Sequence, residues 1–250
     1  MDSVLISAAS GLRARMESLD MLANNIANAG TAGYKSDGEF YGLYSASEAV
    51  EAALEGTSPA PSTLPVVEGH WTDLGQGTLT PTGSALDLAL GTPGFFAASG
   101  PSGTLYTRNG NFHLSPDGTL VTAENYSVLG TDGQPLQADP ADGAITVAGD
   151  GSVQQNGAEI GQVAVFQFQS TVGFDKCGKS YLRPSDPSAT PVAAADVEIH
   201  QGQLEASNVS TAASAVHLVK VMRQFEMLQK AITLTGEMSK QAVSEVAKVS

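Results

Sequence analysis

The stretch NNIANAGTAGYK, residues 24–35, places three asparagines and two glycines within twelve residues, directly after an apolar-striped N-terminal segment. Asparagine and glycine disfavour the interior of a helix, so this stretch predicts that a helix ends here. Asn24 and Asn28 are one helical turn apart, whereas Asn25 lies about 100° away around the helix. The amides are therefore expected to contact different neighbours.

The second half of the stretch predicts a reversal of the chain. Gly30 fits the residue that follows a helix in the left-handed conformation, and Gly33 permits a positive φ in the turn. Tyr34 and Lys35 are expected to anchor the exit from this turn. The alternative is that the asparagines only cap a fraying helix end.

Two amphipathic helices are predicted, one at each end of the chain. Apolar residues recur at alternating steps of three and four, the spacing of a coiled-coil seam. In residues 3–29, where Arg15 interrupts it, the seam consists of Leu5, Ala8, Leu12, Leu19, Leu22, Ile26 and Ala29. From residue 208 onward it consists of Leu218, Val221, Phe225, Leu228, Ile232, Thr235, Ala242 and Val246. A second apolar face of this helix comprises Val219, Met222, Met227, Leu234 and Met238, and Asn208 fits its N-cap. A helix that is apolar on two faces needs more than one neighbour.

Residues 78–203 have a different texture, with short β-prone runs such as TLYT, TLVT and QVAVFQF. The runs are separated by turn-forming pairs at Asn109-Gly110, Asp117-Gly118, Asp132-Gly133, Asp150-Gly151 and Asn156-Gly157. Closely spaced turns of this kind predict an antiparallel all-β domain.

The chain is thus predicted to have a mixed α and β fold, in which terminal coiled-coil-like helices flank a central antiparallel all-β domain. The expected parts are residues 1–35 (N-terminal helix and turn), 36–77 (an extended connector containing TSPAPSTLP), 78–203 (β-rich domain) and 204–250. The last part is a helix expected to join the N-terminal helix in one helical domain. Periodicity leaves two arrangements open: the helices dock on the β domain, or they complete their core against other subunits.

Composition disfavours several classes of function. Lys and Arg total 12 against 26 Asp and Glu, so a net charge of −14 disfavours nucleic acid and anionic membrane surfaces as partners. A single cysteine, Cys177, excludes an intramolecular disulfide. The N-terminus lacks the pattern of a cleavable signal peptide, and no apolar run reaches the roughly 18 residues of a membrane span. The four histidines lack metal-ligand spacing and no catalytic motif is present, so we expect neither an enzyme nor a cofactor nor a metal.

Three motifs resemble the flagellar rod and hook proteins, the axial proteins of the bacterial flagellum. LANNIANAGTAGYK resembles their N-terminal signature, and GQLEASNVSTAASAVHLVKVMRQFEMLQKAI, residues 202–232, resembles their C-terminal one. Between them, DLALGTPGFFAASGPSGTLYTRNGNFHLSPDGTLVT, residues 87–122, is similar to the family's β-domain segment. Length and the run RQFEMLQKAI favour the proximal rod type over the distal rod or hook types, although the long segment from residue 41 to 64 resembles the distal type.

The resemblance implies a subunit that polymerises through its terminal helices into the periplasmic rod around the export channel. Its partners would be copies of itself, other rod proteins and the flagellar type III export apparatus, with export that needs no cleavable signal. In a tube of identical helices a buried asparagine fixes the register, because other registers leave its amide unsatisfied. The residues expected at subunit contacts are Leu12, Leu19, Leu22, Asn24, Asn25, Ile26, Asn28, Gly33, Tyr34, Asn208, Val209, Leu218, Val221, Arg223, Phe225, Glu226, Leu228 and Ile232. The rival hypothesis is a β-rich adhesin or binding module. Such a module would bind its ligand on exposed aromatic side chains, and Trp71 is the only tryptophan in the sequence.

Overall fold

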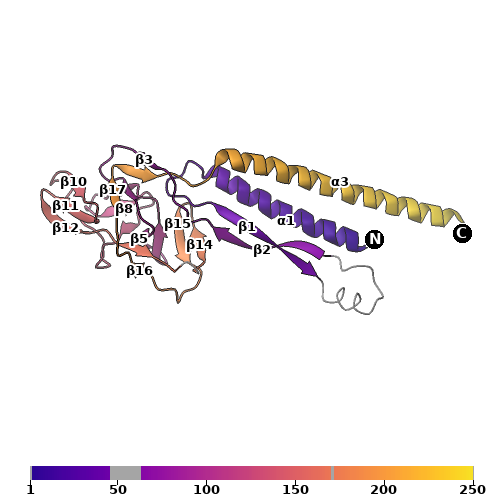
Figure 1. Cartoon of the computed structure of the whole chain (residues 1–250), viewed down its shortest axis with the longest axis horizontal. Coiled ribbons are helices and arrows are strands. Elements are labelled where there is room, and N and C mark those ends of the chain that lie inside the picture. The colour runs from indigo at the N-terminus through magenta and orange to yellow at the C-terminus, as the bar shows by residue number, and fades with distance from the viewer. Residues whose placement is uncertain (1, 46–62, 170–171, 250) are drawn as a thin grey trace. The chain divides into compact units, whose positions relative to one another are not determined.

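The computed structural model describes residues 2–45, 63–169 and 172–249 of the 250-residue chain. The chain divides into two compact units (Figure 1). The first, here called the helical unit, comprises Met1–Ile26, Asp37–Trp71 and Ser210–Ser250. The second, the β unit, comprises Ala27–Ser36 and Thr72–Val209. The predicted order of an N-terminal helix, a central antiparallel β domain and a C-terminal helix is confirmed.

The helical unit contains α1 (Asp2–Ala27), α3 (Thr211–Val249) and two paired strands, β1 (Asp37–Ser45) and β2 (Thr63–Thr72). Leu22 of α1 and Val221 of α3 are buried, as expected for seam positions. The two helices approach closely at Gly11, where an added Cβ would lie 3.4 Å from Cδ1 of Leu228. Within the described residues, neither helix is both long and apolar enough to cross a bilayer.

The β1–β2 pair occupies much of the segment predicted as an extended connector, residues 36–77, so that prediction was wrong for these strands. Trp71 lies against Gly38, where an added Cβ would be 2.5 Å from the indole ring. The sequence offered no short turn between the two strands, because residues 46–62 separate them. Those residues, which include most of TSPAPSTLP, lie outside the described part of the chain.

The β unit is built around one nine-stranded sheet in which the described pairings are antiparallel. Its main path runs β14-β15-β6-β5-β9-β8-β7, and β13 pairs with both β5 and β16. The strands are β5 (Phe95–Gly100), β6 (Gly103–Thr107), β7 (Phe112–Leu114), β8 (Leu120–Thr122), β9 (Ser127–Val128), β13 (Val165–Gln167), β14 (Phe174–Cys177), β15 (Tyr181–Pro184) and β16 (Val192–Ala193).

Three smaller sheets complete the unit, with the orders β10-β11-β12, β17-β4 and β18-β3. They are formed by β3 (Leu79–Pro81), β4 (Leu88–Leu90), β10 (Ile145–Val147), β11 (Ser152–Gln155), β12 (Ala158–Gln162), β17 (Ile199–Gln201) and β18 (Gln203–Glu205). Because β18 lies in the C-terminal signature and β17 directly precedes it, and the two strands pair with β3 and β4, the end of this unit closes back on its beginning.

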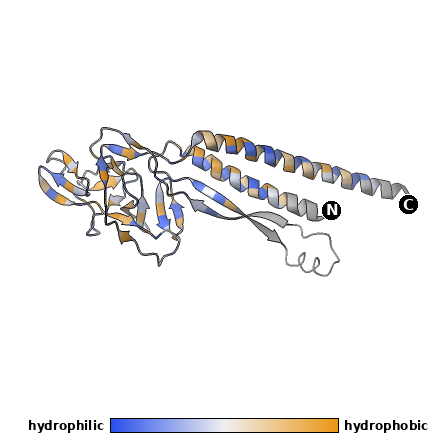
Figure 2. Ribbon diagram, in the orientation of Figure 1, coloured by the Kyte–Doolittle hydropathy of each residue, from blue (hydrophilic) through white to orange (hydrophobic). Residues whose placement is uncertain are grey.

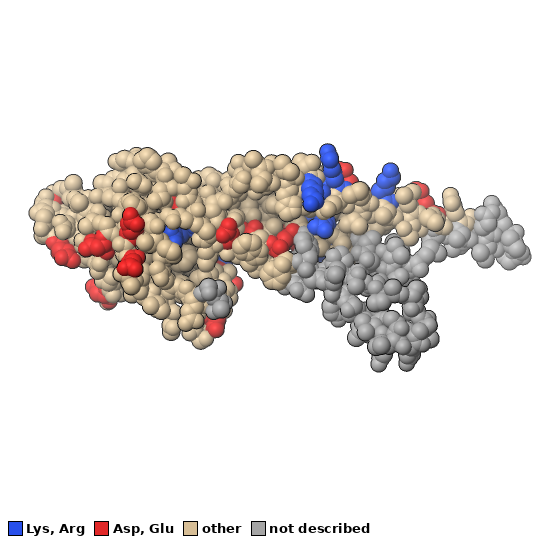
Figure 3. Space-filling view, viewed as in Figure 1, with Lys and Arg blue, Asp and Glu red and all other residues tan. Residues whose placement is uncertain are grey.

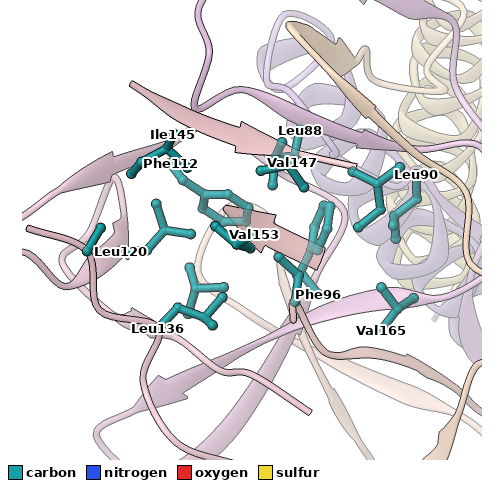
Figure 4. Packing of buried hydrophobic residues seen from close by; sticks show 14 residues of the cluster. Leu88, Leu90, Phe96, Phe112, Leu120, Leu136, Ile145, Val147, Val153 and Val165 are labelled. Carbon is teal, nitrogen blue, oxygen red and sulfur yellow. The ribbon is translucent and has the colours of Figure 1, made fainter. Parts of the chain in front are cut away.

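One large apolar cluster holds the β unit together (Figure 4). At its centre the rings of Phe96 and Phe112 meet edge to face, with centroids 5.2 Å apart. Such pairs are worth about 0.5–1.5 kcal/mol beyond the burial of their area. The predicted turns at Gly118, Gly133, Gly151 and Gly157 are confirmed, since each glycine has a positive φ. The predicted turn at Asn109-Gly110 was wrong, because no turn is formed there and Gly110 has no positive φ.

Candidate functional site

Segments far apart in the sequence meet in the β unit just after the turn of the opening stretch. The backbone N–H of Gly33 donates to the carbonyl oxygen of Glu205 at 2.7 Å. The N–H of Ser36 donates to Oδ1 of Asn208 at 2.7 Å, and the N–H of Asp73 donates to the carbonyl oxygen of Ser36 at 2.8 Å. These bonds connect the N-terminal stretch to the C-terminal signature within one compact unit.

A buried charge cluster, formed by Lys35, Arg108 and Glu205, lies at this junction. Nζ of Lys35 donates to Oε1 of Glu205 at 2.5 Å, and Nη1 of Arg108 donates to Oε2 at 3.1 Å. The N–H of Gly77 is the third donor to this carboxylate, and it lies 2.8 Å from Oε1. The three charged side chains are 2%, 4% and 0% exposed, respectively. One carboxylate therefore serves two buried cations.

Burial determines the electrostatics of the cluster. Desolvation lowers the pKa of Lys35, while Glu205 acts in the opposite direction through its hydrogen bond and its charge. Desolvation likewise lowers the pKa of Arg108, and again Glu205 opposes the shift. Removing one partner from a buried ion pair leaves an uncompensated charge. Loss of the Glu205 carboxylate would therefore leave both Lys35 and Arg108 buried without a counter-charge.

Tyr34 covers the neighbouring part of the junction. Its side chain is buried, and Nζ of Lys176 lies 4.0 Å from the centroid of its ring. The same ammonium donates to the carbonyl oxygen of Lys35 at 2.6 Å. Tyr34 and Lys35 thus anchor the exit from the turn as expected: Tyr34 through burial and its contact with Lys176, and Lys35 through its ion pair with Glu205.

The turn itself depends on Gly33. Its φ is +66°, as predicted, and an added Cβ would lie 2.2 Å from the backbone nitrogen of Asn109. Gly30 was predicted as a left-handed residue after the helix, and this was wrong, because the left-handed glycine of the turn is Gly33. Glycine is required at this position because Gly33 lies against the backbone of Arg108 and Asn109, just after β6.

Asn208 was predicted to cap the C-terminal helix, and this was also wrong. Its amide Nδ2 donates to the carbonyl oxygens of Asp73 and Gly75, at 2.8 Å and 3.2 Å, while its Oδ1 accepts from Ser36. The helix α3 begins at Thr211, and Ser210 accepts the N–H groups of the first turn. The carboxamide is therefore used to connect chain segments of the β unit.

The three asparagines of the opening stretch have different surroundings, as their angular positions predicted. Asn25 is buried, and its carboxamide makes two hydrogen bonds with the backbone of Asp37. Nδ2 of Asn25 donates to the carbonyl oxygen of Asp37 at 2.8 Å, and the N–H of Asp37 donates to Oδ1 of Asn25 at 3.0 Å. Asn28 accepts at Oδ1 from the hydroxyl of Thr31 at 3.4 Å, and Asn24 is exposed. Asn25 thus fixes the start of β1 against α1 within the helical unit.

Replacing Asn25 with alanine is expected to destabilise the helical unit by about 1–3 kcal/mol, because both backbone groups of Asp37 lose a partner in a partly buried place. The control is Asp20→Ala, exposed on the same helix, which should change stability by less than about 0.5 kcal/mol. Urea unfolding followed by the fluorescence of Trp71, which lies in the same unit, measures both. Equal effects would contradict the role given to Asn25.

The remaining predicted contact residues divide into two groups. Along the helices, Val221 and Leu22 are buried, and those half-buried are Leu12, Leu19, Ile26, Leu218, Phe225, Leu228 and Ile232. Arg223 and Glu226 are exposed on α3, and Val209 is half-buried at the end of the β unit. The seam of α3 therefore faces into the helical unit of the same chain.

A second face of α3 carries exposed apolar residues, and Figure 2 shows hydrophobic positions alternating with hydrophilic ones along this helix. Val216, Met227, Leu234 and Met238 are between 50% and 72% exposed. Their spacings of 11, 7 and 4 residues place them along one line of the helix, roughly 130° around its axis from the centre of the seam. We call this line the outer stripe.

Sequence reasoning missed Arg108 and Glu205. A signal existed, because Arg108 is the only charged residue between Asp87 and Asp117. Similarly, Glu205 is the only acidic residue between Glu198 and Glu226. A lone charge within a long uncharged stretch fits a buried and paired position, although the sequence does not reveal its partner.

Comparison with known families gives three matches. Residues 5–35 match the flagella basal body rod protein family, 89–155 the flagellar hook protein FlgE/F/G D1 domain, and 200–245 the flagellar basal body rod FlgEFG protein C-terminal region. The buried charge cluster takes one residue from each match: Lys35, Arg108 and Glu205.

Individual relatives match over nearly the whole chain. The flagellar basal-body rod protein FlgF of Caulobacter vibrioides is 34% identical over 249 residues, which cover 100% of both chains. FlgF of Mesorhizobium japonicum is 30% identical, covering 99% of this chain and 98% of the relative. The rod protein FlgG of Bacillus subtilis is also 30% identical, covering 96% of this chain and 97% of the relative.

Proposed function

The chain belongs to the family of flagellar basal-body rod proteins, and we propose that it polymerises through its helices into the proximal part of the rod. The rod so formed would enclose the export channel and transmit torque. Its partners would be copies of itself and other rod proteins, and it would reach the periplasm through the flagellar type III apparatus. This is a structural role without catalysis.

The outer stripe of α3 is the observation that carries the proposal. The seam already packs inside the helical unit, so the stripe is a second apolar face on the same helix. A surface helix of a monomer normally carries polar residues there. Lys220, Arg223 and Lys230 lie between the apolar residues along the stripe, at nearly the same angles around the helix, and Figure 3 shows Lys and Arg gathered over the helices. A line in which apolar and basic side chains alternate fits a neighbouring helix of an acidic protein, such as a copy of this chain.

The buried charge cluster supports the mechanical part of the proposal. Residues 27–36 leave α1 and residues 203–209 lead into α3, and both segments are tied into the β unit by Glu205 and Asn208. A load arriving along either helix therefore reaches the same bonded junction. Coiled-coil-like packing of the helices with those of other subunits would complete this path.

The proximal assignment rests on the sequence. The run RQFEMLQKAI, residues 223–232, favours the proximal over the distal rod type, and the hook type is the next alternative. Electron microscopy of a strain that lacks the gene separates them: basal bodies that stop early in rod formation support the proximal type. Nearly complete rods in that strain would favour the distal type.

Met227→Asp is expected to abolish motility and to stall rod formation, because it places a charge in the centre of the outer stripe. The matched control is Gln229→Asp, exposed on the same helix about 160° around its axis from Met227. It carries the same new side chain and should leave motility near normal. Motility assays and basal-body images compare the two, and near-ultraviolet circular dichroism checks that both β units melt alike. Normal rods with Met227→Asp would contradict the assembly role of the stripe.

A further inference from the structure

A cleft of about 160 Å³ opens in the β unit on the side of Arg108. Its walls are largely apolar and include Leu74, Phe95, Phe168 and Phe174, while Gln167 contributes an amide. The aromatic walls support one another: Phe168 meets Phe174 edge to face with centroids 5.1 Å apart, and Phe95 lies 5.6 Å from Phe174. Rings braced in this way form a preformed pocket of the kind that receives a small apolar group.

Arg108 lines this cleft with an incomplete set of hydrogen bonds. Its Nη1 is used by Glu205, whereas its Nε is buried and has no acceptor among the described residues. The guanidinium carbon lies 5.5 Å from the centroid of Phe95, so the planar group is held against the aromatic wall. Burying an N–H group without an acceptor is unfavourable, because the group gives up its hydrogen bond to water.

The charges around Arg108 are compatible with a further anion. Arg108 shares its ion-pair partner Glu205 with Lys35, on which the charge of Asp73 also acts. Guanidinium groups bind carboxylates through two parallel N–H bonds, and Arg108 has donors left for such a group. An anion in the cleft would supply an acceptor for the unpaired N–H.

We propose that the cleft binds an acidic side chain flanked by an apolar one, supplied by a second copy of this chain in the assembled rod. The carboxylate would meet Arg108, and the apolar neighbour would pack among Phe95, Phe168 and Phe174. A copy of the chain is the fitting source, because it carries 26 acidic residues against 12 basic ones. Figure 3 shows acidic groups spread over the visible face of the β unit. The choice of a second copy rests on the proposed rod function, whereas binding of the carboxylate does not.

The first test uses the full chain and two small probes, phenylacetate and phenylacetamide, which differ in charge and have the same aromatic body. Nuclear magnetic resonance of the Arg108 Nε–H group follows each titration. Phenylacetate should shift this signal and bind at least tenfold more tightly than the amide. Equal binding of the two probes, or no shift with phenylacetate, would overturn the carboxylate site.

A pair of variants locates the binding in the cleft. Leu74→Glu adds a negative charge to the cleft wall and should weaken phenylacetate binding at least tenfold. Thr146→Glu makes the same charge change at the exposed residue of β10, in the separate three-stranded sheet, and should leave binding unchanged. Equal effects of the two variants would show that net charge, and not the cleft, governs binding.

The source of the acidic group is tested in assembled rods, with a photo-crosslinking amino acid at Leu74. Mass spectrometry should identify a crosslink to an acidic segment of a second copy of this chain. A crosslink to a different protein would overturn this choice of occupant while leaving the phenylacetate result intact. Failure of the rod function itself would appear separately, as normal motility with Met227→Asp.

Discussion

Glu205→Ala is expected to lower the free energy of unfolding of the β unit by about 3–5 kcal/mol, because it removes the one carboxylate between Lys35 and Arg108. Both cations would then stay buried without a counter-charge, and the N–H of Gly77 would lose its acceptor. A loss of this size is a large share of the stability of an ordinary domain. Amide hydrogen exchange in β5 and β6 under increasing denaturant measures it.

Two further variants separate charge from hydrogen bonding. Glu205→Gln keeps an oxygen for the N–H of Gly77 and removes the negative charge, so it should be nearly as harmful as alanine if neutralisation dominates. Glu198→Ala breaks an exposed pair in which Oε1 of Glu198 lies 3.4 Å from Nε2 of His200. This change should lower the free energy of unfolding by no more than about 1 kcal/mol. A Glu205→Gln protein as stable as the wild type would show that the two cations do not depend on the charge.

Gly33→Ala is expected to destabilise the β unit by more than about 3 kcal/mol, through two effects that act together. A φ of +66° costs a residue with a side chain about 1–2 kcal/mol. The added methyl group would also lie 2.2 Å from the nitrogen of Asn109, which is backbone and cannot rotate aside. The turn would have to move away from the bend at Arg108 and Asn109 that follows β6.

The same chain provides a control for each effect. Gly178 has a φ of +78° with nothing within 4 Å of an added Cβ, so Gly178→Ala should show only the conformational cost. Gly30 has neither a positive φ nor a close neighbour, so Gly30→Ala should be neutral or slightly stabilising. Thermal melts of the three variants should rank Gly33 far below Gly178, with Gly30 highest. Similar melts for Gly33→Ala and Gly178→Ala would rule out the steric effect.

Local patterns predicted the elements whose causes are local. The seam positions of α1 and α3 follow from a period that any amphipathic helix shows, and Leu22 and Val221 are indeed buried. Gly118 and Gly157 lie in the predicted turns because the pairs Asp-Gly and Asn-Gly tolerate a positive φ. The resemblance to a known family supplied the role of the chain, which neither pattern contains.

Features that depend on distant partners could not be predicted from the sequence. Asn208 fits an N-cap by type and position, yet three backbone groups of residues 36, 73 and 75 compete for its carboxamide and determine its place. The pairing of Lys35 with Glu205 requires the closure of β18 on β3, which no local signal encodes. Likewise, β1 and β2 are separated by an insertion, so neither strand is marked by a nearby turn.

The ion pair between Lys35 and Glu205 joins residues that are 170 positions apart, and this spacing orders events during synthesis. At ~5–20 residues per second, the ribosome adds Glu205 roughly 10–35 s after Lys35. Until Glu205 is made, Lys35 and, once it has been added, Arg108 remain hydrated, because enclosing either cation without its carboxylate is unfavourable. The strands β17 and β18, which close the unit, are also made in this last phase. The nascent chain therefore stays open through most of translation and acquires its native β unit only as a late event.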